Sequence, residues 1–230
     1  MLYNSYKWNQ YRSGVWKAKS VLDNAANEFY IQEGYNALCG YYVPNPYGAI
    51  ECKERYEDGR CKKYVMSGTD DSLPRDYNGV DSECALLYNS FLKNMNIVKS
   101  CTSNAYLNGC IPGYEGLDTI WQKNNPDGDD YQMNASVSGC GGFKKDQIKT
   151  VSSAFITADG MIFFTYGTRN AKIVAFDVNG QKGPNKWGHD LHFLSATKTD
   201  YNSGVNYKPY ACGGIVEAGG KSTSKILSGK

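Results

Sequence analysis

Apolar residues recur at alternating spacings of three and four near the start of the chain. They are Trp8, Tyr11, Val15, Ala18, Leu22, Ala25 and Phe29. This spacing places them on one stripe of an α-helix, opposite a polar face. No proline interrupts residues 2–33, and Gly34 is suited to end a helix. We therefore expect a helical region over residues 1–36 that packs its stripe on the protein's own sheet; a coiled coil of about three heptads is the alternative.

The last third of the chain has the pattern of short strands separated by turns. Asp159-Gly160 is a strong two-residue hairpin signal between two apolar segments. The expected strands are 151–158, 161–166, 172–178 and 191–196. We predict a small antiparallel sheet of three or four strands over residues 151–196. Residues 197–230 are weakly patterned, and we expect a loose tail from Gly219 onward.

Residues 37–150 lack a continuous pattern, because proline and glycine divide them into short pieces. Within them, residues 82–99 have helical spacing, and Asp81 or Ser82 could cap that helix. The fold class that these patterns favour is α+β. A long N-terminal helix packs on a small antiparallel sheet, and a cysteine-rich insertion lies between helix and sheet within a single domain, residues 1–230.

Eight cysteines form an even set, concentrated in the middle of the chain. They are Cys39, Cys52, Cys61, Cys84, Cys101, Cys110, Cys140 and Cys212. No pair has the CxxC spacing that is typical of zinc ribbons and redox sites. We therefore predict four disulfides, formed in an oxidising compartment. The connectivity does not follow from the sequence.

Charge and composition exclude several classes of protein. The 25 Lys and Arg residues nearly balance the 23 Asp and Glu residues, so a nucleic-acid partner is not expected. The 19 tyrosines argue against disorder. The sequence has no signal peptide and no apolar run near the roughly 18 residues of a membrane span. Because disulfides imply export, we expect an upstream segment to precede Met1 in the native protein.

Catalytic signatures are missing, so we predict that the chain is not an enzyme. No GxSxG motif occurs. His189 and His192 would point to opposite sides of a strand, which disfavours a zinc pair. The acidic residues Asp127, Asp129 and Asp130 are interpreted as a solvated turn rather than a cation site. A hydrolase with a pair of carboxylates is a third possibility that no spacing favours.

Residues 155–163 and 175–193 together resemble prepilin-like proteins of the type IV pilin and type II secretion pseudopilin class. The motif members are Asp177, Asn179, Gly180, Lys182, Gly183, Pro184, Asn185, Gly188 and Asp190. The resemblance is specific over residues 151–193, architectural over 2–36 and absent over 37–150. The hydrophobic N-terminal segment of the family, with its glutamate, is missing here.

This resemblance implies a structural subunit of a type IV pilus or a type II secretion filament. Such a subunit is anchored in the bacterial inner membrane through its N-terminal helix. It then assembles with other pilin or pseudopilin subunits, facing the periplasm or the cell surface. The alternative is a carbohydrate- or protein-binding adhesin module. In that case exposed aromatic rings would contact the ligand; the candidates are Tyr41, Tyr42, Tyr47 and Tyr114.

The loop from Asp177 to Asp190 is the candidate metal site. Asp177, Asn179 and Asp190, with loop carbonyls, offer the oxygen ligands that Ca²⁺ prefers. Some pseudopilins bind calcium in a late loop, so the resemblance supports this interpretation. The loop is not an EF-hand. The favoured interpretation is a structural loop, in which Asp and Asn side chains cap turns, and calcium is the alternative.

Overall fold

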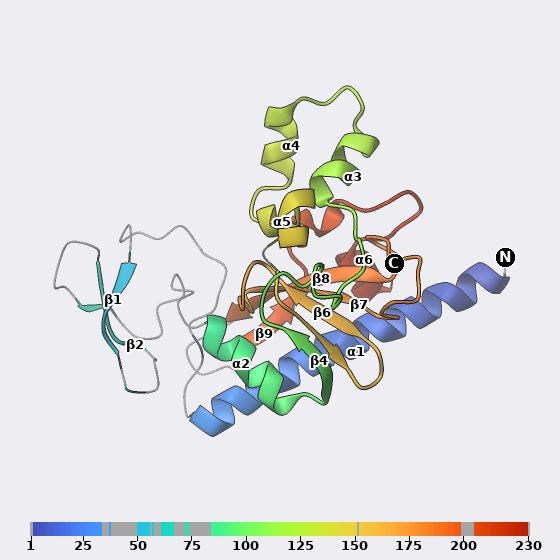
Figure 1. Cartoon of the computed structure of the whole chain (residues 1–230). Helices are drawn as coiled ribbons and strands as arrows, with labels where there is room; N and C mark the ends of the chain where they lie inside the picture. The colour runs from blue at the N-terminus through green and yellow to red at the C-terminus, as the bar shows by residue number, and fades with distance from the viewer. Residues whose placement is uncertain are drawn as a thin grey trace.

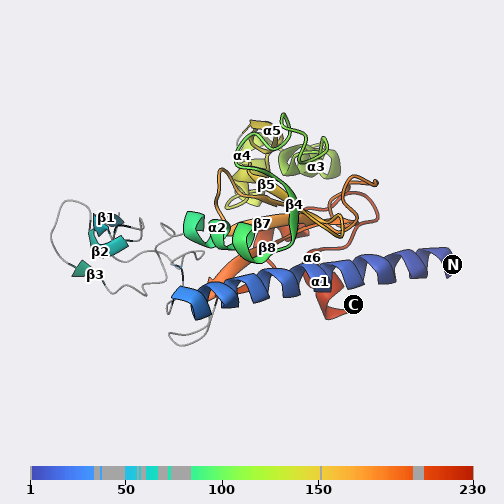
Figure 2. The ribbon, with the colours of Figure 1, turned by 60° about the horizontal axis from the view of Figure 1, so that its bottom comes forward.

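A computed structural model describes residues 2–33, 37, 50–55, 57, 61–66, 72–73, 84–150, 152–198 and 205–229. A long helix and two short ones lie on one face of a six-stranded sheet, and the helices of residues 117–150 lie on the other face (Figures 1 and 2). The expected α+β architecture of an N-terminal helix on an antiparallel sheet is therefore confirmed. None of the helices in these residues combines the length and apolar character that crossing a bilayer requires.

The N-terminal helix α1 spans Leu2–Glu33, as its periodicity predicts. Every member of the predicted stripe from Tyr11 to Phe29 is buried, with Val15 and Leu22 at 0% exposure. The helix packs on the chain's own sheet and on helix α2 (Cys84–Asn94), so the prediction that its stripe packs on the sheet rather than in a coiled coil is confirmed. The side chain of Asp23 also accepts a hydrogen bond from the backbone N–H of Tyr207 (2.7 Å), which joins the helix to the edge strand β9 (Val205–Lys208). Gly34 lies outside the described residues.

The main sheet is an antiparallel meander in the order β4-β5-β6-β7-β8-β9. Its strands are β4 Ile97–Cys101, β5 Ala154–Thr157, β6 Ile162–Thr165, β7 Ile173–Asp177, β8 Leu191–Lys198 and β9 Val205–Lys208. The four central strands match the predicted ones, and Asp159 and Gly160 form the turn between β5 and β6. The sheet is larger than predicted, because β4 and β9 add an edge strand on each side.

Both faces of the central strands are buried. Along β7, Val174 and Phe176 face the core that contains α1 and α2, whereas Ile173 and Ala175 face a second core. The part of the chain between β4 and β5, which from here on is called the insertion, supplies this second core. Its helices are α3 Leu117–Asn124, α4 Asp130–Ser136, the 3₁₀ turn η1 Gly141–Phe143 and α5 Lys145–Thr150. A strand that is covered on both faces reads as a continuous apolar run, as these strands do.

The segment 82–99 is not a single helix. Helix α2 spans Cys84–Asn94, and the chain then enters β4 at Ile97. The predicted caps Asp81 and Ser82 lie outside the described residues. Farther upstream, a second antiparallel sheet in the order β1-β2-β3 is formed by Ile50–Arg55, Cys61–Met66 and Ser72–Leu73.

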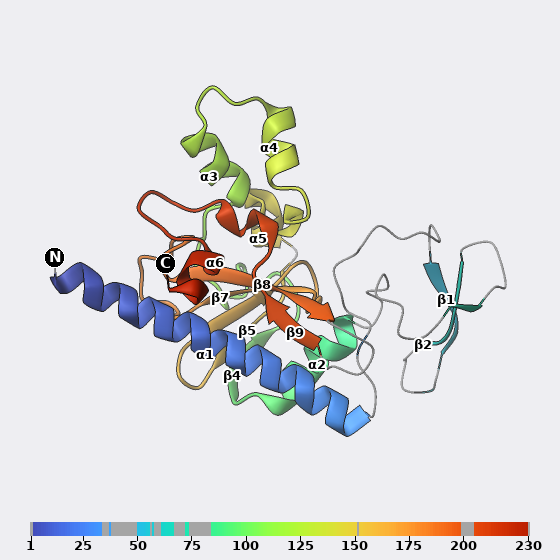
Figure 3. The same ribbon diagram turned by 180° about the vertical axis from the view of Figure 1, so that it is seen from behind.

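The prediction of a loose tail from Gly219 is wrong. After β9 the chain forms the 3₁₀ turn η2 (Ala211–Gly214) and helix α6 (Thr223–Ser228). Thr223 and Ile226 are buried, and Ser222 caps the helix through the N–H of Lys225. Figure 3 shows α6 beside the N-terminal half of α1, with which it shares a core.

Disulfides are present as predicted. Cys101 pairs with Cys110, and Cys140 pairs with Cys212. Cys84 is also disulfide-bonded, and none of the described cysteines is free. Cys39 lies outside the described residues, as do the side chains of Cys52 and Cys61, so the prediction of four disulfides stays a prediction. The Cys140–Cys212 bond ties the insertion to the C-terminal segment.

Candidate cation-binding loop

The loop between β7 and β8 brings the two predicted acidic residues together. Asp177 is the last residue of β7, and Asp190 directly precedes β8. Both residues have 0% exposure. The backbone N–H of Val178 donates to the carbonyl of Asp190 (3.0 Å), which closes the base of the loop. The loop therefore places two carboxylates inside the protein rather than at its surface.

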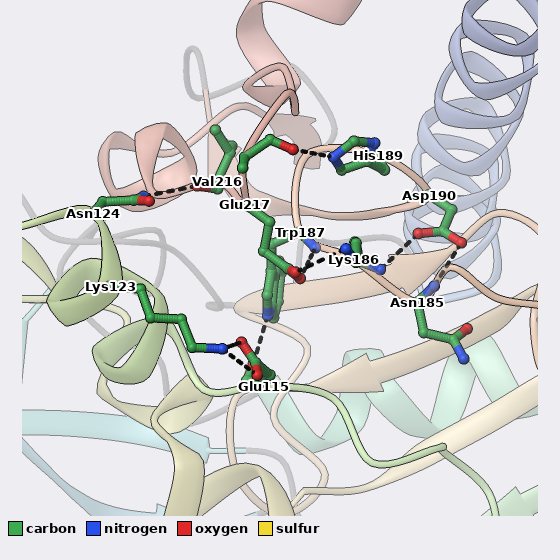
Figure 4. A network of polar contacts seen from close by, with 11 residues as sticks. Glu115, Lys123, Asn124, Asn185, Lys186, Trp187, His189, Asp190, Val216 and Glu217 are labelled. Atoms are coloured by element: carbon green, nitrogen blue, oxygen red, sulfur yellow. Dashed lines mark hydrogen bonds and ion pairs between the residues drawn. The ribbon is translucent and has the colours of Figure 1, made fainter.

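Both carboxylates cap turns, as the structural interpretation predicts. Asp190 accepts hydrogen bonds from the N–H groups of Asn185 (2.9 Å) and Lys186 (2.8 Å), as Figure 4 shows. Asp177 accepts from the N–H of Asn179 (3.1 Å) and from the hydroxyl of Tyr114 (3.2 Å). These bonds fix the loop without any added ligand.

Further oxygen atoms gather around Asp177. One terminal atom of the Asn185 side-chain amide lies 3.0 Å from the carbonyl oxygen of Gly180 and 3.0 Å from Oδ2 of Asp177. When the amide nitrogen occupies this position, it donates to both oxygens. Only a turn of the amide by 180° away from this hydrogen-bonded arrangement would bring three oxygens together, as a bound cation requires. The side-chain oxygen of Asn179 is buried and has no hydrogen-bond partner.

Asn185 is the ligand candidate that the sequence analysis missed. It was recognised as a motif member but not as a possible ligand. The signal that could have found it is its place directly after Gly183-Pro184, in a turn where Asn185 has a positive φ of 56°. Asparagine tolerates this left-handed conformation better than most residues.

The electrostatics of the loop disfavour two negative charges. Burial, and after it the charge of Asp190, raises the pKa of Asp177 from 3.8 to about 8. Burial also raises the pKa of Tyr114 well above its usual value, with the charge of Asp177 as the next cause. A divalent cation would offset this repulsion and let both carboxylates ionise.

The donor set fits calcium better than a transition metal. Within the described part of the chain, no three His, Cys, Asp or Glu side chains lie close enough together to hold a metal ion. Amide and carbonyl oxygens would therefore have to complete the coordination of Asp177 and Asp190. Calcium accepts such ligands and takes six to eight oxygens, whereas zinc prefers nitrogen and sulfur.

A network of polar contacts fixes the outer half of the loop from the C-terminal side. The carboxylate of Glu217 accepts a hydrogen bond from the N–H of Trp187 (3.1 Å), and the N–H of Glu217 donates to the Trp187 carbonyl (2.9 Å). The N–H of Lys221 donates to the carbonyl of Gly188 (2.7 Å). The indole of Trp187 donates to the carbonyl of Glu115 (2.8 Å), which adds the insertion to this network (Figure 4).

Helix α1 contacts the same loop from another side. The ring of Trp8 stacks on His189 with 5.6 Å between centroids, and the ammonium of Lys221 lies 5.4 Å from the centre of the Trp8 ring. Farther along the helix, a Cβ atom at Gly14 would lie 2.6 Å from Cβ of Val178. Glycine in the middle of this helix is explained by this close approach of helix and loop.

The remaining predicted residues lie elsewhere. His192 is buried, with its Nε2 3.0 Å from the carbonyl of His189, and burial lowers its pKa to about 4. His189 instead directs its Nε2 toward the carbonyl of Ala218 (3.1 Å). The two imidazoles are therefore engaged in separate contacts. Asp129 caps α4 through the N–H of Gln132, which agrees with a structural, solvated turn.

Of the four tyrosines proposed to contact a ligand, the structure describes Tyr114. Tyr114 is 2% exposed and stacks on Phe164 inside the second core. It therefore cannot stack on a sugar, and this part of the adhesin interpretation is wrong. Tyr41, Tyr42 and Tyr47 lie outside the described residues. No protein-family model, no curated protein and no solved structure matches this chain.

Proposed function

We propose that this chain is the outer domain of a filament subunit of the type IV pilin or type II secretion pseudopilin class. It acts by assembly and surface presentation rather than by catalysis. Its partners would be other subunits of the filament, and its place would be the periplasmic side or the outer surface of a bacterium. A hydrophobic N-terminal segment would anchor it in the inner membrane before assembly.

The observation that supports this proposal most is the arrangement of α1. The helix has 32 residues, and its apolar stripe is buried on the sheet from Tyr11 to Phe29. Toward its N-terminus the helix extends past the sheet (Figure 1), and Tyr6 is 63% exposed there. A helix that is packed along most of its length and extends past the sheet at its N-terminal end suits a subunit that packs helix against helix in a filament.

We further propose that calcium binds the loop between β7 and β8. The buried carboxylates of Asp177 and Asp190, the amides of Asn179 and Asn185 and the carbonyl of Gly180 supply the oxygens. The ion would stabilise the loop on which the Trp8 end of the helix rests. Its role would be structural, because the same carboxylates cap the turns of this loop.

The experiment that tests the proposal begins with the gene upstream of Met1. We expect it to encode a prepilin peptidase site and a hydrophobic helix in phase with Trp8, Tyr11 and Val15. Antibodies against the chain should then label filaments sheared from the source bacterium. A strain whose copy lacks the hydrophobic segment should make unlabelled filaments, which serves as the control.

An ordinary cleaved signal peptide in place of the prepilin site would contradict the proposal. The chain would then be found free in the medium or periplasm, and no filament would carry it. In that case a secreted binding module, such as the adhesin, would become the better interpretation. A glycan array would test that alternative directly.

A further inference from the structure

A short loop at the start of the insertion, which we call the knob (residues 101–110), carries two exposed apolar side chains at its tip. The Cys101–Cys110 disulfide closes it. At its tip Leu107 is 73% exposed and Tyr106 is 38% exposed. A loop closed by a disulfide loses little conformational entropy when it binds, so its two exposed apolar side chains suit a contact with a partner.

Backbone and side-chain hydrogen bonds hold the knob in one shape. The N–H of Cys110 donates to the carbonyl of Ala105 (2.8 Å), and the N–H of Ala105 donates to the carbonyl of Ser152 (3.0 Å). Two lysines flank the apolar tip. Lys99 donates to the carbonyl of Gly109 (2.8 Å), and the ammonium of Lys149 lies 5.8 Å from the centre of the Tyr106 ring.

An apolar groove of about 410 Å³ lies between α1, the end of α2 and the β5–β6 turn. Val21, Ala25, Met161 and Phe163 contribute its apolar lining, and the exposed Ala158 lies at its edge. The groove also carries two acidic residues: the exposed Glu28, and Asp159, which pairs with Lys17. An apolar hollow with acidic groups complements an apolar tip that is flanked by lysines.

The groove and the knob lie at opposite ends of the edge strand β4. At one end Ile97 pairs with Thr157, and the N–H of Ala158 donates to the carbonyl of Asn96 beside the groove. At the other end Cys101 pairs with Ala154, where the knob begins. Because the strand separates them, the knob of one copy cannot fill its own groove.

We propose that the knob of one copy of this chain inserts into the groove of a second copy. Two different surfaces would then meet, and each copy would keep one free knob and one free groove. Such a head-to-tail contact adds copies without closing unless the rotation forms a ring. Because it names the contact between neighbouring subunits, this inference rests on the proposed function.

Sedimentation velocity on the chain as it stands tests this contact. The interface is small, so association is weak and the concentration series should extend to about 1 mM. We expect the average mass to rise beyond that of a dimer. Leu107→Asp in the knob and Ala158→Arg in the groove should each weaken association by about tenfold or more. Both sites are exposed, so the melting temperature should stay unchanged.

Mixing the two variants gives the sharper result. The L107D chain keeps a working groove, and the A158R chain keeps a working knob, so an equimolar mixture should form heterodimers and nothing larger. Glu28→Lys is a second groove variant and should also weaken association. Tyr131→Asp is the matched control, because Tyr131 is 83% exposed on α4, and it should associate like the parent.

Three results would overturn the inference. They are a parent chain that stays monomeric at about 1 mM, a closed dimer that survives both substitutions, and a Y131D variant that associates as poorly as L107D. The second result would assign the contact to the open edge of β4 instead. None of them bears on the upstream segment or on filament labelling, so failure here is distinct from failure of the proposed function.

Discussion

Replacing Asp177 with Asn should change how the stability of the metal-free protein depends on pH. Burial, together with the charge of Asp190, raises the pKa of Asp177 from 3.8 to about 8 in the folded chain. Between these values the native chain keeps a proton that the unfolded chain has lost. The native state therefore binds more protons, and stability falls as the pH rises through this window. The amide of the D177N variant is neutral at every pH and removes the effect.

The size of the effect follows from the two pKa values. Below pH 3.8 Asp177 is protonated in both states and does not change the free energy of unfolding. Above about pH 8 the difference between the two pKa values lowers that free energy by roughly 6 kcal/mol. Between pH 6.5 and 8 the parent should lose about 1.5 kcal/mol of unfolding free energy from this group. In this pH range the titration of His192 does not contribute. His192, whose pKa is lowered to about 4 by burial, changes stability only below about pH 6.5.

The assay is urea unfolding at pH 6.5, 7, 7.5 and 8, followed by circular dichroism, with chelator-treated protein and intact disulfides. The parent should lose stability across this series, whereas D177N should not. Asp127→Asn is the matched control, because Asp127 is exposed and its variant should follow the parent. Saturating calcium should remove most of the slope in the parent, because the bound ion keeps Asp177 ionised. Calcium should leave D177N nearly unchanged.

A parent whose metal-free stability stays constant or rises from pH 6.5 to 8 would refute this reasoning. Asp177 would then be ionised in the native state without a cation. If the slope appears in the parent and calcium has no effect on it, the raised pKa of Asp177 is supported and the proposed calcium site is wrong. The two parts of the argument therefore fail separately.

Three further substitutions test the packing. Gly14→Ala should destabilise the protein by about 1–3 kcal/mol in thermal unfolding, although alanine favours helices, because its Cβ would lie 2.6 Å from that of Val178; a variant as stable as the parent would show that α1 can shift away. His192→Gln should reduce the loss of stability between pH 6.5 and about 4, where the buried imidazole stays neutral and the unfolded one is charged, and an unchanged acid limb would argue against its burial. Replacing both Cys140 and Cys212 by Ser should cost about 4 kcal/mol in denaturant unfolding, because the bond closes a segment of 72 residues, and a loss below about 1 kcal/mol would contradict this.

Local patterns predicted the elements whose backbone hydrogen bonds are local. The helix that carries the stripe from Tyr11 to Phe29 is identified by the spacing of its own residues. The hairpin at Asp159-Gly160 is identified by its own turn residues. The edge strand β4 was missed, because its pairing partner lies far away in sequence, whereas β9 pairs with the preceding strand β8 but is only four residues long. Ile97–Cys101 pairs with a strand that begins at Ala154, beyond the whole helical insertion. Its residues are mostly exposed, so no apolar alternation marks it as a strand.

The second core was missed for a related reason. Proline and glycine divide residues 102–150 into pieces too short for periodicity to identify. Their burial comes from the sheet face that they cover, as Phe143 shows by packing against Phe164 and Trp187. In the candidate site, the motif was enough to pair Asp177 with Asp190. The amide of Asn185 was not predictable in the same way, because its direction depends on the turn around it.

The loop between β7 and β8 is where three distant parts of the chain meet. Trp8 of α1 stacks on its His189, Glu217 of the C-terminal segment bonds to its Trp187, and Tyr114 of the insertion bonds to its Asp177. A change in the charge of Asp177 therefore acts on groups that hold α1 in place as well as on the loop. If calcium removes the repulsion between the two carboxylates, it stabilises the loop against which the N-terminal half of α1 packs. In the proposed subunit that half leads into the membrane segment, so the ion would act on assembly through the helix and not through the surface of the loop.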